Sequence, residues 1–180
     1  SSLAPIAQPF LDQLSDEVGE TVHLAQFDNG QVLYVDKRNP SSPIEMYSQA
    51  GKIGPAYCTG VGKAMMAFLD EETKSKVISQ QSFYPFTNST ITTEKKLRKE
   101  LIEIKTQGIA FDRQEHEAKI ICISCPILSS KGRVFGGLSI TSSIEIHSLK
   151  SLEVFKPQLL KTAILIGQEA DSWNFPEELN

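Results

Sequence analysis

The spacing of hydrophobic positions changes along the chain, and each change marks an expected element. In residues 1–18 apolar side chains recur every three or four positions, which predicts an amphipathic helix that ends at Gly19. Residues 21–28 and 31–37 are rich in β-branched and aromatic side chains and are joined by Asn29-Gly30, the pair that favours a type I′ turn. The chain is therefore expected to open with a helix followed by a β-hairpin.

The middle of the chain predicts short elements between irregular stretches. Residues 43–48 are expected to form a third strand, and the glycines and proline of residues 51–59 predict an irregular segment. A helix is expected to begin near Gly60, and a second short helix to follow its N-cap at Asp70. A third helix is expected over residues 93–107, because Gly108 provides its stop.

Two more strands and a helix are expected in the last third of the chain. The strands cover residues 120–128 and 133–141, and the helix runs from Leu149 to about residue 169. Pro157 is expected either to kink this helix or to lie in its first turn. The order of helix, strands, helices, strands and helix predicts an α+β fold with an antiparallel sheet, because alternating βαβ units are absent from the pattern.

Composition narrows the class of protein. The 180 residues suffice for one domain with its own core, and a net charge of -4 argues against a nucleic-acid surface on this domain. Three cysteines do not suggest a disulfide framework, so a reducing cytoplasm is expected. No apolar run reaches the ~20 residues of a membrane span. Because the chain begins Ser1-Ser2 without an initiator Met, we expect it to be part of a longer protein.

The late hairpin has two unlike faces. If residues 129–132 close it without a bulge, Cys122 lies opposite Ser139, and side chains alternate between the faces. The uniformly apolar face, which must be core, carries Ile121, Ile123, Cys125, Ile127, Val134, Leu138 and Ile140. The small and partly polar face carries Ile120, Cys122, Ser124, Phe135, Gly137, Ser139 and Thr141. Because residues 120–128 carry no charge, we expect this second face to line a partly polar pocket rather than to meet solvent.

Other candidate chemistry in the sequence is weak. Glu115, His116 and Glu117 are consecutive and cannot all face one metal ion. Cys122 has no evident base for nucleophilic catalysis, so we expect no catalytic residue, no metal and no cofactor. The glycine-rich segment 57–64 lacks the pattern of a phosphate loop. Its backbone N–H groups at a helix start either receive a carboxylate or simply form a tight turn.

The chain resembles the effector-binding domain of IclR-type bacterial transcription regulators. The likeness runs from about Leu3 to Ala170 and implies about six antiparallel strands flanked by helices, as in GAF and profilin-like sensor domains. The segments that carry it are Gly19-Glu20-Thr21-Val22, Met46-Tyr47-Ser48, residues 57–64, residues 108–112 with Glu115, Cys122-Ile123 and residues 136–141.

The resemblance implies a pocket for a small organic acid, with no metal and no cofactor. The implied effector-binding residues are Asp112, Cys122, Ser139 and Thr141 on the polar side, Gly60 and Val61 through backbone N–H groups, and Met46 as an apolar wall. Pro43 and Gly54 fall where relatives carry leucines, which implies a roomier pocket than a two-carbon acid needs. The pattern looks closest to regulators of sugar-acid catabolism, so a sugar-derived keto acid is the expected effector.

The family also implies partners and a domain plan. Residues 1–18 would be the linker helix that arrives from an N-terminal winged helix-turn-helix domain, and residues 19–180 the effector-binding domain. The expected protein is a cytoplasmic homo-oligomer, dimer or tetramer, that contacts operator DNA through the other domain and has no membrane partner. Two alternatives are a GAF-like sensor of another signalling protein and a small-acid enzyme that uses Asp112, Glu115, His116 or Cys122.

Overall fold

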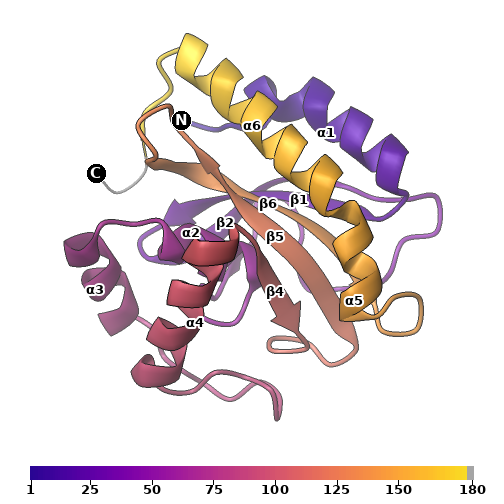
Figure 1. Cartoon of the computed structure of the whole chain (residues 1–180). Helices are drawn as coiled ribbons and strands as arrows, with labels where there is room; N and C mark the ends of the chain where they lie inside the picture. The colour runs from indigo at the N-terminus through magenta and orange to yellow at the C-terminus, as the bar shows by residue number, and fades with distance from the viewer. Residues whose placement is uncertain (178–180) are drawn as a thin grey trace.

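A curved antiparallel sheet organises the chain in the computed structural model, which describes residues 1–177 (Figure 1). Its strand order is β3-β2-β1-β6-β5-β4, and each neighbouring pair is antiparallel. The strands are β1 (Thr21–Asp28), β2 (Gln31–Arg38), β3 (Ile53–Gly54), β4 (Ala110–Arg113), β5 (Ile120–Leu128) and β6 (Val134–Ser143). The helices are α1 (Ala4–Val18), α2 (Gly60–Ala67), α3 (Glu71–Ser79), α4 (Glu94–Gln107), α5 (Leu149–Leu152), the 3-10 turn η1 (Glu153–Phe155) and α6 (Lys156–Ser172).

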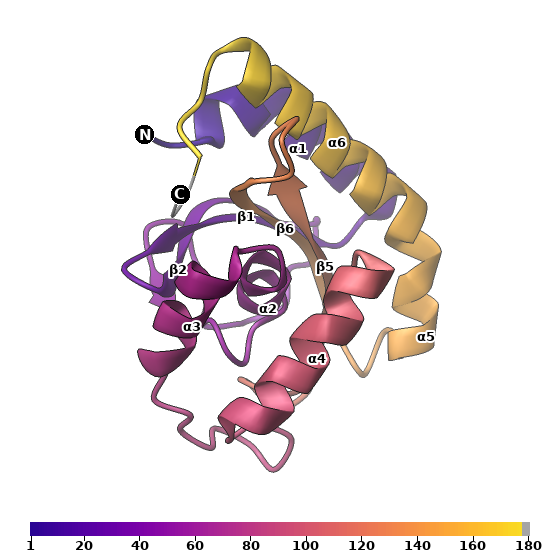
Figure 2. The same ribbon diagram turned by 60° about the vertical axis from the view of Figure 1, so that its left-hand side comes forward.

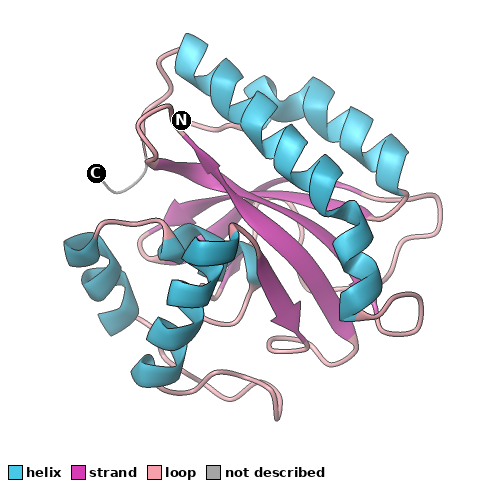
Figure 3. Cartoon of the chain, viewed as in Figure 1, coloured by secondary structure: helices cyan, strands magenta, loops and turns pink. Residues whose placement is uncertain are grey.

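Helices cover both faces of the sheet, and the two groups differ in position and length. The long helices α1 and α6 lie side by side over one face, while α2, α3 and α4 cover the other (Figures 1 and 2). Figure 3 shows the sheet as the layer between them. Each face has its own cluster of buried apolar side chains. The expected α+β fold with about six antiparallel strands is thus present.

Local chemistry explains where several elements begin and end. Asn29 and Gly30 have φ values of 51° and 78°, the left-handed conformation that a type I′ hairpin turn requires. Gly108 ends α4 with a φ of 79° and donates its N–H to Ile104 O. The side chains of Asp70 and Thr93 cap α3 and α4 as N-caps. These signals were readable in the sequence, and the predicted bounds are close to the observed ones.

Two sequence-based expectations about elements are wrong. Residues 43–48 form no strand; the third strand is instead the short β3, inside the segment that we expected to be irregular. The backbone of residues 47 and 48 has no strand ladder and is instead held by hydrogen bonds to the side chains of Glu117 and Lys37. The C-terminal helix was expected to be continuous from Leu149, but η1 separates α5 from α6. Pro157 lies in the first turn of α6, which is one of the two positions expected for it.

A β-bulge changes the register of the β5–β6 hairpin. Ile127 pairs with Gly136 but Leu128 pairs with Val134, so Phe135 is the extra residue. The assumption of a hairpin without a bulge was therefore wrong. Cys122 lies opposite Thr141 rather than Ser139, and Ser139 lies opposite Ser124. Val134 and Phe135 also exchange faces: Phe135 joins the core under α1 and α6, and Val134 joins the core on the α2 side.

Helix α1 is part of the domain core. Its apolar stripe is buried with α6 against the sheet, and Leu3 donates its N–H to the Gln26 side chain on β1. The role of residues 1–18 as a linker from another domain stays a prediction. Within the described part of the chain, none of the helices combines the length and the hydrophobicity that crossing a membrane requires.

Candidate ligand-binding cavity

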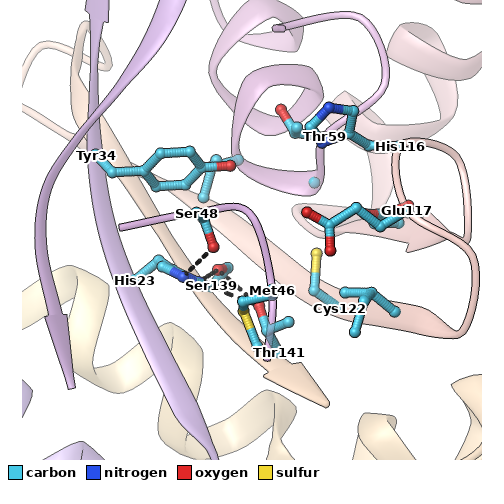
Figure 4. Close-up of a pocket in the computed structure, with 14 residues that line it drawn as sticks. His23, Tyr34, Met46, Ser48, Thr59, His116, Glu117, Cys122, Ser139 and Thr141 are labelled. Carbon is cyan, nitrogen blue, oxygen red and sulfur yellow. Dashed lines mark hydrogen bonds between the residues drawn. The ribbon is translucent and has the colours of Figure 1, made fainter. Parts of the chain in front are cut away.

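A partly polar cavity lies between the sheet and the start of α2 (Figure 4). Strands β1, β2, β5 and β6 form its floor, and the segment around residue 47 and the turn after β4 close its sides. Its volume is about 40 Å³, which is room for roughly three water-sized groups. A space of this size encloses one small functional group and its neighbouring carbon atoms.

The structure brings all seven sequence-predicted effector-binding residues to this one cavity. They are Met46, Gly60, Val61, Asp112, Cys122, Ser139 and Thr141. The alternation of β5 and β6 survives the bulge because the bulge lies near the hairpin turn, away from these residues. Their proximity is a fact of the fold, whereas their role in binding an effector stays a prediction.

Seven further residues line the cavity and were not among the predicted effector-binding residues, although Ile120 was expected on the pocket-lining face and His116 was named for the enzyme alternative. They are His23, Tyr34, Ser48, Thr59, His116, Glu117 and Ile120. The available signal was the alternation of β1, which places His23 and Thr21 on the face opposite Val22 and Leu24. Only the pairing of β1 with β6 shows that His23 lies opposite Ser139, and strand order is not written in either strand alone.

Neutral polar groups from three segments meet at His23. Its Nε2 lies 2.7 Å from Ser48 Oγ, and its Nδ1 lies 3.3 Å from Thr141 Oγ1 and 3.4 Å from Ser139 Oγ (Figure 4). Burial, with a smaller effect of Lys37, lowers the pKa of His23 to about 3. His23 is therefore neutral at physiological pH and acts as a hydrogen-bonding link between the sheet and Ser48.

The first turn of α2 presents backbone N–H groups to the cavity. Thr59 caps the helix by accepting from Gly62 N, and no acceptor for the N–H of Gly60 or Val61 is found in residues 1–177. Gly60 has to be glycine, because a Cβ there would lie 2.4 Å from Ser124 Oγ and 2.5 Å from Cys122 Sγ. Close packing of α2 on β5 thus aims two free donors and the positive helix end at the cavity.

Asp112 is present in both its protonated and its ionised form near neutral pH. Burial, together with the nearby Glu115 carboxylate, raises the pKa of Asp112 to about 7. Its Oδ1 accepts a hydrogen bond of 2.8 Å from Glu115 N. A protonated Asp112 would donate a hydrogen bond to an anionic ligand, and the ionised form would repel the same ligand.

The two glutamates that follow β4 lie in different places: Glu117 lines the cavity, and Glu115 does not. Glu115 turns away from the cavity and binds the buried Lys63, whose Nζ lies 2.9 and 2.7 Å from its two carboxylate oxygens. Lys63 also donates to Phe111 O at 2.7 Å and pairs with Glu100 on α4. Burial opposes the charge of Lys63, but Glu115 and Glu100 raise its pKa above the ordinary value. This ion cluster fixes the turn that follows Asp112, which itself lies on β4 opposite Cys122.

Cys122 is poorly suited to be a nucleophile. Burial raises the pKa of the Cys122 thiol to about 12, so it stays protonated near neutral pH. Its polar neighbour is Ser124 Oγ at 3.5 Å, and His23 hydrogen-bonds to hydroxyl groups instead. The cavity thus offers hydroxyls, a thiol and free amides, which fit reversible binding better than covalent chemistry.

A small polar cavity between an antiparallel sheet and its covering helices is the architecture of a small-molecule sensor domain. The family of bacterial transcriptional regulators described as IclR C-terminal matches residues 1–167. The chain belongs to this family. The expected resemblance is thereby confirmed, and so is the expectation that the chain is not an enzyme, because the family and its named relatives are transcriptional regulators.

Individual relatives agree with the family match. The chain is 28% identical over 164 residues to the HTH-type transcriptional regulator KdgR of Escherichia coli, an alignment that covers 91% of this chain and 62% of KdgR. The crystal structure of Thermotoga maritima IclR has a TM-score of 0.88 at 30% identity and covers 94% of this chain and 68% of that one. A double mutant of the PobR inducer-binding domain from Acinetobacter, in complex with 3-hydroxybenzoic acid, has a TM-score of 0.81 at 25% identity and covers 93% and 98%.

Proposed function

We propose that this domain binds a small organic acid, a keto acid or a sugar acid, in the cavity beside α2. Binding would change the affinity of a larger regulator for its operator DNA. The observation that carries the proposal is the pair of N–H groups of Gly60 and Val61, which have no acceptor among the described residues and share one cavity with five hydroxyl-bearing residues. The solved PobR complex supports it, because a relative of the same fold holds an aromatic acid.

The electrostatics of the cavity favour one carboxylate in a defined place. Among the described residues, no Lys or Arg side chain lines the cavity, so the positive end of α2 is its main attraction for an anion. Asp112 and Glu117 bring negative charge nearby. A carboxylate is therefore expected to lie against α2 and to favour the protonated form of Asp112.

Regulation would follow from coupling between this cavity and a DNA-binding domain. We expect effector binding to alter how two or four subunits present such domains, with a coupling of about 1–3 kcal/mol between the sites. The chain spans 62% of the length of KdgR, and we expect DNA binding to reside in a separate domain of the regulator. Light scattering at high concentration tests the oligomer, and a monomer would contradict this part of the proposal.

Calorimetric titration with pyruvate tests the site itself. Ser139→Ala removes a hydroxyl that lines the cavity and is expected to weaken binding by about 1.5–3 kcal/mol, the value of a hydrogen bond to a charged group. Ser142→Ala is the matched control, because Ser142 is buried on the same strand but lies outside the cavity. Equal affinity of wild type and Ser139→Ala would contradict the proposed site.

A further inference from the structure

A second space lies directly outside the cavity. This outer groove has a volume of about 470 Å³, more than ten times that of the inner cavity, and runs along residues 37–49. Met46 and Glu117 line both spaces and therefore stand between them. We call these two residues the partition. Both are half-buried, so each side chain has one side toward the cavity and one toward solvent.

Hydrogen bonds from three elements hold the backbone beside the partition. Glu117 Oε1 accepts from Tyr47 N at 2.6 Å, Lys37 Nζ donates to Ser48 O at 2.8 Å, and Ser48 Oγ lies 2.7 Å from His23 Nε2. The segment that carries Met46 is thus fixed by side chains rather than by a strand ladder. Side-chain rotation of Met46 and Glu117 would join the two spaces without unfolding any element.

Room for a larger ligand lies in the outer groove rather than in the cavity. Pro43, one of the two positions at which the resemblance implies leucines in relatives, lines the outer groove. At the other position, Gly54 leaves space that the Tyr34 ring takes up, since a Cβ on Gly54 would lie 3.2 Å from that ring. The inner cavity itself is small, with room for a carboxylate and the adjoining atoms.

We propose that the partition sets which effectors bind: the ligand extends past Met46 and Glu117, and its distal hydroxyl groups bind in the outer groove. This inference rests on the proposed function. Glu117 Oε2 has no hydrogen-bond partner within residues 1–177, and the Glu117 side chain lines the cavity (Figure 4). It would accept from a ligand hydroxyl, while Lys37 would donate to one. Glu45 and Glu117 would repel a second carboxylate, which selects a hydroxylated tail over a dicarboxylate.

Calorimetry with four acids tests the inference. The probes are pyruvate, and the six-carbon acids 2-oxohexanoate, 2-oxoadipate and 2-keto-D-gluconate, whose distal parts are apolar, anionic and hydroxylated. Wild type is expected to bind 2-keto-D-gluconate at least about tenfold more tightly than the other three, because a hydrogen bond to a charged group is worth that much or more. Pyruvate would contact only the inner cavity.

Two variants and a control locate the effect at the partition. Glu117→Gln keeps an oxygen for Tyr47 N but replaces the free carboxylate oxygen, so it should weaken 2-keto-D-gluconate about tenfold and pyruvate by less than about threefold. Met46→Phe narrows the passage and should act in the same direction. The control Glu103→Gln removes an exposed carboxylate on α4, outside both spaces, and should change the affinity for 2-keto-D-gluconate by less than about threefold. Melting temperatures of the variants show that each is folded.

Each outcome decides between the two proposals. If pyruvate binds but the hydroxylated acid binds no more tightly, or if Glu117→Gln weakens both acids equally, the partition does not select effectors and the proposed function stands. If none of the four acids binds to wild type, the proposed function fails and this inference fails with it.

Discussion

The two faces of the sheet differ in which side chains they bury and in how completely these are packed. Under α1 and α6 the sheet presents a continuous apolar surface, with Leu24, Leu138 and Ile140 fully buried. Under α2 the same strands present a histidine, hydroxyls and a thiol, and the space is left partly open. The first face is therefore packed throughout, whereas the second has an apolar cluster of its own beside a cavity in which polar groups stay available to a ligand.

The difference shows how a strand can serve two purposes at once. In β6, residues 138, 140 and 142 point to the apolar face, and residues 139 and 141 point to the cavity. The cavity face replaces lost packing with the ion cluster of Lys63, which joins α2, α4 and the turn after β4. Substitutions on the two faces should thus separate stability from binding.

The largest effect is expected at the ion cluster. Lys63→Met leaves the Glu115 carboxylate, which is 2% exposed, without its cation. Breaking a buried pair in this way destabilises proteins by about 3–5 kcal/mol, and urea unfolding measures it. The control Lys119→Met removes an exposed cation that pairs with Glu145 and should leave the unfolding midpoint almost unchanged. A small loss in Lys63→Met would show that the cluster is not what supports the cavity face.

A substitution that leaves a void in the apolar core under α1 and α6 should lower the stability of the domain but leave the binding site intact. Leu138→Ala is expected to reduce the free energy of unfolding by about 2–5 kcal/mol, because Leu138 is fully buried under α1 and α6. Affinity for a small acid, measured below the unfolding transition, should stay within about threefold of wild type. A strong loss of affinity with modest destabilisation would mean that the two faces are not independent. The control Ile102→Ala changes an exposed side chain on α4.

The pH dependence of binding should report the proton of Asp112. Because an anionic ligand favours protonated Asp112, affinity should be constant well below pH 7 and fall as pH rises through about 7, by up to about tenfold per pH unit. Asp112→Asn keeps an oxygen for Glu115 N and a donor for the ligand, so it should bind with little pH dependence. Calorimetry between pH 6 and pH 8 tests this, with Asp112→Ala expected to bind weakly throughout. Affinity of wild type that rises with pH would refute the assigned role.

The smallest effect is expected on the apolar side of β6. The Ser142 hydroxyl is buried and has no hydrogen-bond partner among the described residues. Ser142→Ala removes this unsatisfied group and should stabilise the domain by up to about 1 kcal/mol while leaving affinity unchanged. Thermal unfolding measures the change, and a clear destabilisation would indicate that the hydroxyl has a partner after all.

Sequence patterns predicted the cavity residues of β5 and β6 better than those that other strands and loops contribute. Alternation along β5 and β6 placed Cys122, Ser139 and Thr141 on one partly polar face, because that signal is local. The glycine-rich start of α2 allowed either a carboxylate site or a tight turn, and the family resemblance singled out Gly60 and Val61. The register between the two strands was wrong, since a bulge at Phe135 has no signature in the alternation itself. The pairing therefore differs from the expected one along the whole hairpin, but only Val134 and Phe135 lie on other faces than expected.

The residues that sequence reasoning missed depend on which strands are neighbours. His23 and Tyr34 come to the cavity because β1 lies between β2 and β6, an order that the local pattern of each strand does not specify. The segment around Met46 was expected to be a strand, although its place is set by side chains of Lys37 and Glu117. Long-range hydrogen bonds of this kind leave no periodic trace in a sequence.

The central claim is that the free N–H groups at the start of α2 receive a carboxylate, and amide NMR tests it most directly. During titration of the ¹⁵N-labelled domain with pyruvate and with 2-keto-D-gluconate, the amide signals of Gly60 and Val61 are predicted to shift most, because they donate to the ligand. The amide of Gly132, in the β5–β6 turn, should stay in place. Saturable binding that leaves Gly60 and Val61 unshifted, or no binding of either acid, would contradict the account.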